Sequence, residues 1–179
     1  TIHPFVCLWI AVDGDDNWYV YDEHYQSGET IKYHADQINA KSIYQQYVAT
    51  YRDPSAAQLE LELAQYGIYT VPADNSVNSD DLEVGISKIQ TKLTKNVKLG
   101  KPSLFVFKNC VNLIREFGLY QWAEHKNKDR KVPNFPLKIN DDALDSLRYF
   151  GNSYLGMPKK KHDDRNWSLG PKPNKFTGY

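Results

Sequence analysis

Aspartates at two distant places in the sequence could form a metal site. Asp53 stands directly before a proline, and Asp141, Asp142 and Asp145 lie close together near the C-terminal end. Carboxylate oxygens are the ligands that Mg²⁺ prefers. Two clusters of carboxylates can bind a pair of metal ions about 3.5–4 Å apart, and such a pair can catalyse the hydrolysis of a phosphodiester. The residue types therefore suggest two divalent ions, Mg²⁺ or Mn²⁺, and Asp53, Asp142 and Asp145 are the candidate catalytic ligands.

Each of these carboxylates also has a purely structural explanation. Asp is a favoured N-cap and Pro a favoured first helical residue, so Asp53 could simply begin a helix. The three later aspartates could form a solvated first turn, in which the helix dipole stabilises each by about 0.3–1 kcal/mol. Asp142 and Asp145 are three residues apart and would share a helix face. A bound cation would offset their repulsion better than the dipole does.

Other kinds of chemistry find no support in the sequence. It contains no HExxH, CxxC, P-loop or GxSxG motif. The histidines show no metal-ligand spacing. Cys7 lies in an apolar run and Cys110 at the start of a helical pattern, so both are expected to be reduced core thiols.

Composition and charge bound the possible classes of protein. The chain has 179 residues, of which 41% are hydrophobic and 25% charged, which suits one globular domain. No apolar run reaches the ~18–20 residues of a membrane helix, and no secretory signal is visible. Residues 1–90 carry a net charge of −10 and residues 91–179 a net charge of +10. This division suggests a cation-binding region beside a polyanion-binding one, although two ordinary solvated faces would also explain it.

Hydrophobic periodicity predicts an α/β domain that must position these residues. Strands are predicted at 5–12, 17–25, 47–51, 68–71 and 104–107. Helices are predicted at 30–40, 55–66, 79–93, 110–120 and 141–150. Residues 124–140 are expected to form a loop or irregular hairpin. The domain is predicted to end at residue 150, with 151–179 as a C-terminal tail.

Four sequence blocks resemble the C-terminal nuclease domain of bacteriophage terminase large subunits. They are WYVYDEHYQSGETIKYHADQI at 18–38, YRDPSAAQ at 51–58, LFVFKNCVNLIREFGLYQW at 104–122 and DDALDSLRY at 141–149. Their order and spacing agree with the family over roughly residues 3–150. The resemblance implies an RNase H-like fold of the RuvC type, with a mixed central β-sheet flanked by helices.

The resemblance also implies roles for individual residues. Asp53 would be the metal ligand on the central strand, and Asp145 the ligand on the last helix. Asp142 matches a position where many members carry His or Asp beside the metals, whereas Asp141 is a weaker candidate. Glu23 matches a recurrent position that we expect to be structural or to support the ligands.

One departure concerns the first catalytic aspartate of the family. That residue lies on the first strand in a G-x-D-x-G context, which this sequence lacks. The match begins just downstream, and the chain starts at Thr1 without a methionine. We therefore expect the first strand, and the ATPase domain with its Walker motif, to lie upstream.

The implied function is metal-dependent cleavage of concatemeric double-stranded DNA during viral packaging, in the cytoplasm of the infected bacterial host. The expected partners are double-stranded DNA, the portal protein, the small terminase subunit and the upstream ATPase domain, with no membrane. Basic residues expected to contact phosphates are Lys92, Lys95, Lys98 and Lys101, and then Lys126, Lys128, Arg130 and Lys131.

Two alternatives remain open from the sequence. The chain could be a non-catalytic DNA- or portal-docking module of the motor, or another RNase H-like nuclease of the junction-resolvase type. Arg148 is expected to pair with a carboxylate rather than with DNA.

Overall fold

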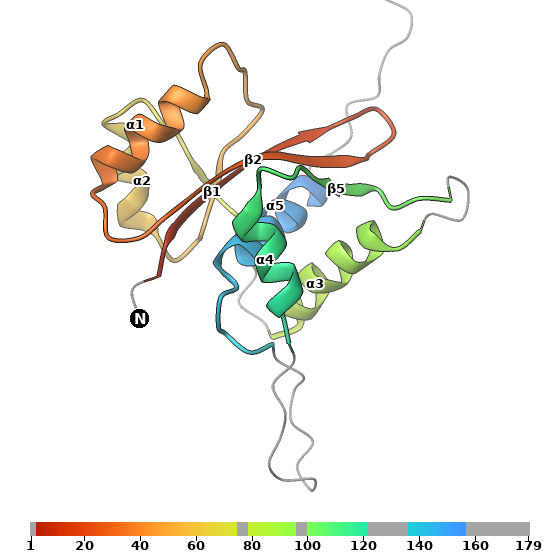
Figure 1. The fold of residues 1–179 in the computed structure, drawn as a ribbon. Helices are drawn as coiled ribbons and strands as arrows, with labels where there is room; N and C mark the ends of the chain where they lie inside the picture. Colours follow the sequence, from red (N-terminus) through yellow and green to blue (C-terminus); the bar gives the residue numbers. More distant parts are fainter. Residues whose placement is uncertain (1–2, 75–78, 96–99, 122–135, 157–179) are drawn as a thin grey trace, which may run out of the picture.

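The computed structural model describes residues 3–74, 79–95, 100–121 and 136–156 (Figure 1). The strands are β1 (Phe5–Val12), β2 (Trp18–Gln26), β3 (Tyr51–Arg52), β4 (Val71–Pro72) and β5 (Leu104–Val106). The helices are α1 (Ile31–Lys41), α2 (Ala57–Ala64), α3 (Ser79–Leu93), α4 (Val111–Leu119) and α5 (Asp142–Gly156). Most of the loop predicted at 124–140 lies outside the described residues.

The strands form two small sheets that flank α5. β1 pairs antiparallel with β2, β2 pairs parallel with β5, and β3 pairs parallel with β4. The register of the β1–β2 hairpin shifts between Trp9 and Ile10, which marks a bulge. Both β1 and β3 contact α5, although they belong to different sheets. The predicted mixed α/β architecture is therefore confirmed.

The alternation of β1 explains the layers of the domain. Phe5, Cys7 and Trp9 point to a small core that they share with α1 and α2. Val6, Leu8 and Ile10 point the other way, to a larger core built with α3, α4 and α5. Successive strand residues face opposite sides, so one hairpin serves two helical layers, which Figure 1 shows on either side of β1 and β2.

α5 continues beyond its predicted end. The sequence places the end of this helix at residue 150 and treats Gly151 as the start of the tail, but the helix runs to Gly156. A Cβ at Gly151 would lie only 3.3 Å from Cη2 of Trp18, so this glycine allows close packing of α5 on β2 rather than ending the helix. The predicted tail at 151–179 therefore begins too early.

Two short strands also lie later than predicted. β3 begins only at Tyr51, because the segment before it is a loop. Oε1 of Gln45 stabilises this loop by accepting hydrogen bonds from the hydroxyls of Tyr21 and Tyr47. Val48 is exposed in this loop. The strand predicted at 68–71 is observed at Val71–Pro72.

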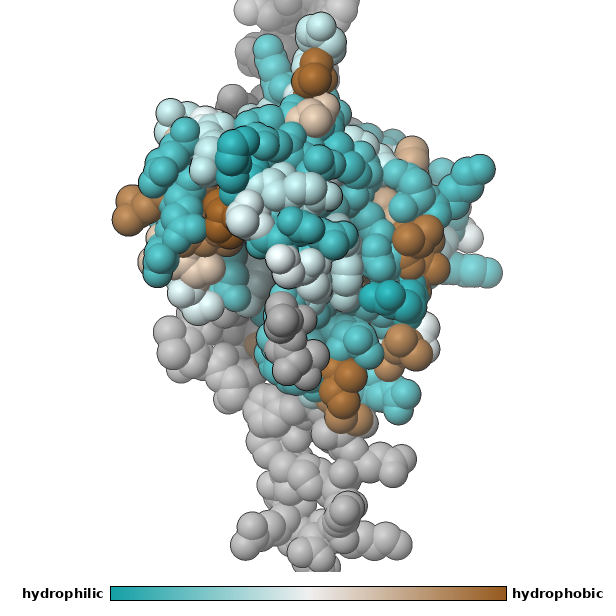
Figure 2. Space-filling model, turned by 60° about the vertical axis from the view of Figure 1, so that its left-hand side comes forward, coloured by the Kyte–Doolittle hydropathy of each residue, from teal (hydrophilic) through white to brown (hydrophobic). Residues whose placement is uncertain are grey.

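The face drawn in Figure 2 is largely hydrophilic. On the face drawn in Figure 2, apolar side chains occur in small separate groups among polar ones. Within the described part of the chain, no helix combines the length and the apolar character needed to cross a membrane.

Candidate functional site

The first turn of α5 carries the predicted acidic cluster. Its backbone donors are satisfied from outside the helix, because Glu116 of α4 accepts hydrogen bonds from the N–H groups of Ala143 and Leu144 at 2.8 and 3.0 Å. Glu116 is fully buried, and burial raises the pKa of its carboxyl. The Tyr25 hydroxyl lies near this carboxylate, but Oε1 has no partner in hydrogen-bonding geometry among the described residues. Since Glu116 caps the helix, the aspartates of α5 are available for other contacts.

Asp145 is held by one buried and one exposed cation. Its Oδ1 accepts hydrogen bonds from Nε and Nη2 of Arg148 at 3.0 and 2.9 Å. Its Oδ2 lies 3.7 Å from Nζ of Lys138. The predicted pairing of Arg148 with a carboxylate is therefore confirmed. The guanidinium fixes one oxygen of Asp145 and leaves the other toward the surface.

Asp141 lies beside Asp145 and is almost completely buried. Burial raises the pKa of Asp141, and the negative charges of Asp145 and Asp142 raise it further, while Lys138 lowers it. The backbone carbonyl of Asp141 accepts the N–H of Asp145 at 2.7 Å, so the residue also begins the helix. Two carboxylates are thus held close together in a partly desolvated setting that attracts a cation.

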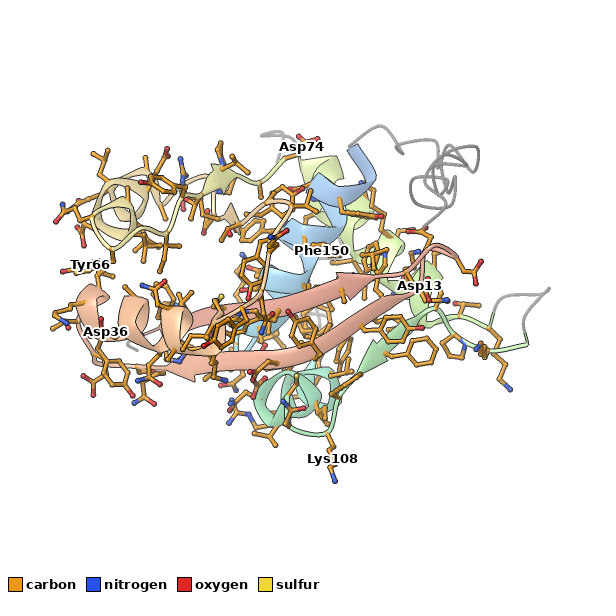
Figure 3. All side chains as sticks on the ribbon, turned by 90° about the horizontal axis from the view of Figure 1, so that it is seen from above. Asp13, Asp36, Tyr66, Asp74, Lys108 and Phe150 are labelled. Carbon is orange, nitrogen blue, oxygen red and sulfur yellow. The ribbon has the colours of Figure 1, made fainter. Side chains whose placement is uncertain are left out.

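Asp53 approaches the same region from the end of β3. Tyr149 of α5 lies within electrostatic range of both groups: burial raises its pKa to about 12, and the charges of Asp53 and then Asp145 contribute to that rise. The rings of Tyr51 and Phe150 also meet, with centroids 6.4 Å apart, where β3 packs on α5 (Figure 3). The fold therefore brings the two predicted ligand sites to one place.

Asp53 does not cap a helix, as the structural explanation predicted, but orders the turn before α2, whose N-cap is Ala56. Its Oδ1 accepts hydrogen bonds from both the N–H and the hydroxyl of Ser55, each at 2.8 Å. This turn precedes α2, which begins at Ala57 rather than at the predicted residue 55. Oδ1 is thus oriented by the turn, and the second oxygen is the one left to face a ligand.

Asp142 has different neighbours from those that its spacing suggested. Its Oδ1 lies 2.9 Å from Nδ1 of His3, just before β1. Its charge also raises the pKa values of Glu116 and Tyr25, which lie on that side of α5. Asp142 thus pairs with His3 and Asp145 with Arg148, although the charges of both aspartates raise the pKa of Asp141.

The donor chemistry fits a hard divalent cation only in part. Asp53, Asp141 and Asp145 offer oxygen ligands from two elements, as Mg²⁺ or Mn²⁺ requires. Within the described ranges, however, no three His, Cys, Asp or Glu side chains converge closely enough to hold one ion. These residues can therefore supply part of a coordination shell but not a complete one.

Glu23 has the structural role that we expected. Its Oε1 accepts hydrogen bonds from the backbone N–H and the side-chain amide of Asn112, and its Oε2 accepts the N–H of Leu113. It caps α4 as Glu116 caps α5. Asn109, which precedes that helix, donates instead to the carbonyl of Tyr21.

The basic residues fall into three groups. Lys95 and Lys101 are exposed, as DNA contacts require. Lys92 is not a surface contact, because its Nζ lies 2.8 Å from Asp16 Oδ2 and 4.7 Å from the centre of the Trp18 ring. The remaining predicted contacts, Lys98, Lys126, Lys128, Arg130 and Lys131, lie outside the described residues.

Neither cysteine is placed for nucleophilic chemistry. Cys110 is fully buried, and burial raises the pKa of Cys7 to about 12 and that of Cys110 to about 11. Both are free thiols. The buried histidines His24 and His34 contact each other, with Nε2 and Nδ1 2.9 Å apart. This pair joins α1 to β2, on the face of the hairpin opposite α5.

Comparison with solved structures identifies similar folds. The large terminase of a thermophilic bacteriophage is 26% identical, with a TM-score of 0.69, over 87% of this chain. The nuclease domain of the bacteriophage SPP1 large terminase, solved with bound Mn, is 21% identical with a TM-score of 0.63, over 83% of this chain and 78% of that domain. The P22 large terminase nuclease domain is 21% identical with a TM-score of 0.62, over 86% of this chain and 76% of that domain.

These similarities confirm the predicted resemblance and the RNase H-like fold. The chain has the fold of a large-terminase nuclease domain. It spans about 37% of the length of the large terminase from the thermophilic phage. No protein-family model matches the sequence, and no curated protein matches it.

Proposed function

We propose that the chain is the metal-dependent endonuclease domain of a viral DNA-packaging terminase large subunit. In this role it cuts concatemeric double-stranded DNA. The observation that supports this most directly is that Asp53, at the end of β3, and Asp145, on α5, come from two elements that pack together. The similarity to a nuclease domain that was solved with bound Mn supports a divalent metal.

The proposed site uses Asp53 and Asp145 as principal ligands, with Asp141 beside them and Asp142 at the edge. Two divalent ions, Mg²⁺ or Mn²⁺, would activate a water and stabilise the leaving oxygen when bound. Ser55 orients the Asp53 carboxylate, and Arg148 fixes that of Asp145. Such positioned ligands need little rearrangement when a cation arrives.

We further propose that a strand outside residues 1–179 completes the site. β1 and β3 end two different sheets, yet both pack on α5. A strand between them would join the sheets and place another carboxylate near Asp53. This accounts for the incomplete set of ligands among the described side chains.

The partners and the setting follow from the same proposal. Double-stranded DNA would contact Lys95, Lys98 and Lys101, and the basic segment from Lys126 to Lys131. An ATPase domain of the same polypeptide, the portal protein and the small terminase subunit would complete the motor. The reaction would take place in the cytoplasm of the infected host.

The incomplete ligand set favours one alternative. If no upstream carboxylate completes the site, the chain would serve as a non-catalytic module that docks DNA or the portal. A junction-resolvase type of nuclease has no such observation in its favour.

Plasmid cleavage tests the proposal. A longer chain with the upstream residues and the 179-residue chain would be compared with Mg²⁺, Mn²⁺ or EDTA. We expect cleavage by the longer chain, blocked by EDTA and reduced about 100-fold or more by Asp53→Asn or Asp145→Asn. Asp36→Asn, a carboxylate on α1 (Figure 3), is the matched control and should cleave normally. Absence of cleavage in every chain, with salt-sensitive DNA binding retained, would favour the docking module instead.

A further inference from the structure

The two cations on Asp145 differ in how firmly they are held. The side chain of Arg148 is 6% exposed and that of Lys138 is 69% exposed. Arg148 is enclosed by α3, because a Cβ at Gly85 would lie 2.5 Å from its Cγ. Arg148 therefore has little room to leave Oδ1, whereas Lys138 can leave Oδ2 by rotating into solvent.

Lys138 also acts on the neighbouring carboxylate. Its positive charge opposes the effects of burial and of Asp145 on Asp141. The ion pair of this ammonium group is with Asp145, and Asp141 feels its charge at longer range. Lys138 lies just before α5, in the described segment 136–141. Because Arg148 occupies Oδ1, Oδ2 is the oxygen of Asp145 that remains for another cation.

We propose that Lys138 occupies the cation position at Oδ2 of Asp145 in the metal-free protein, and that a divalent ion must displace it. This inference rests on the proposed function, because it takes Asp145 as a metal ligand. Exposed ion pairs are weak, so the exchange needs no change in the fold. Lys138 lowers the apparent metal affinity, and its ammonium becomes available to a DNA phosphate once the metal is bound.

A titration with Mn²⁺ alone tests this exchange without relying on cleavage. Paramagnetic broadening of backbone amide NMR signals near Asp145 gives the location and the dissociation constant of the ion. In Lys138→Met we expect the constant to fall about three- to tenfold at low ionic strength, because a competing positive charge is removed. Lys138→Arg keeps the charge and should resemble the original protein.

Lys108→Met is the matched control. Lys108 is exposed between β5 and α4, and Figure 3 shows it pointing away from the domain. The substitution removes the same charge, so it should change the Mn²⁺ constant by less than about twofold. An equal effect of both methionine variants, or no effect of Lys138→Met, would overturn the exchange.

Asp145→Asn separates this inference from the proposed function. If Mn²⁺ broadens the signals near Asp145 and Asp145→Asn removes that effect, the metal site stands, whatever Lys138→Met shows. All variants are made in the longer chain with the upstream residues. If Mn²⁺ broadens no signals near Asp145 in any of them, both the metal site and the exchange at Lys138 are wrong. Thermal melting of each variant shows that the fold is retained.

Discussion

The β1–β2 hairpin buries ionisable side chains on both faces, but their surroundings differ. At α1, His34 of that helix contacts His24 of β2, and burial lowers the pKa of both, which favours their neutral forms. Around α5, burial raises the pKa values of Glu116 and Asp141 while two cations contact Asp145. Burial disfavours the charged form on both faces, but α5 gathers several carboxylates within its first turn, where a metal could bind them.

The same contrast separates the two helices that receive a carboxylate cap. At α4, both oxygens of Glu23 accept hydrogen bonds. At α5, Glu116 uses only one oxygen, and aspartates lie within the first turn. The α4 cap is a completed structural feature, whereas the α5 cap frees neighbouring carboxylates for a ligand.

The largest contrast in the free energy of unfolding should be between variants that remove the two cations beside Asp145, one at a time. Arg148→Met removes a buried partner and should lower the free energy of unfolding by about 2–3 kcal/mol, somewhat less than for a fully buried pair because Asp145 is partly exposed. Lys138→Met should change it by less than about 0.5 kcal/mol. Urea unfolding followed by circular dichroism measures both. Equal losses in the two variants would show that the buried cation does not stabilise the fold more than the exposed one.

Isosteric substitutions at the two caps should give a smaller contrast. Glu23→Gln places an amide NH₂ against a backbone N–H donor, because both carboxylate oxygens are in use, and should cost about 1.5–3 kcal/mol. Glu116→Gln can turn its NH₂ toward the unpartnered side and removes a buried charge, so it should cost less than about 1 kcal/mol. Urea unfolding at neutral pH distinguishes the two, and a larger loss at Glu116 would contradict the proposed difference.

Local patterns in the sequence predicted most of the elements, but not the contacts between them. The periodicity of residues 5–12 and 79–93 correctly gave a strand and a helix. The position of Asp53 near Asp145 came from family resemblance, because nothing local links a strand end to a distant helix. Glu116 was missed as a cap for the same reason, although a glutamate on the apolar stripe of α4 was a usable signal.

Misplaced boundaries have equally physical causes. Gly151 looks like a helix stop because glycine is unfavourable within helices, but the bulk of Trp18 requires a small residue at this point of contact. The alternating segment at 47–51 resembles a strand, yet hydrogen bonds to Gln45 hold its first residues in a loop. In both cases a contact with a side chain outside the local sequence pattern set the boundary of the helix or strand.

The histidine pair should give the smallest effect, and it tests the face of the hairpin that packs on α1. Because the folded-state pKa values of His24 and His34 are lowered, the unfolded chain binds protons more readily. The stability from this pair is therefore present above the ordinary histidine pKa of about 6.5. It is lost progressively as the pH falls from there to the lowered folded-state values.

We expect the free energy of unfolding to fall by about 1 kcal/mol or less from this pair between about pH 7 and pH 5. Lys41 repels a proton on His24 and acts in the same direction. Urea unfolding at several pH values measures this slope, and a double variant, His24→Leu with His34→Leu, removes both titrating groups. An unchanged slope in that variant would mean that the acid sensitivity comes from elsewhere, most directly from the carboxylates around α5. In that case the two faces of the hairpin would not differ in the way their buried groups indicate.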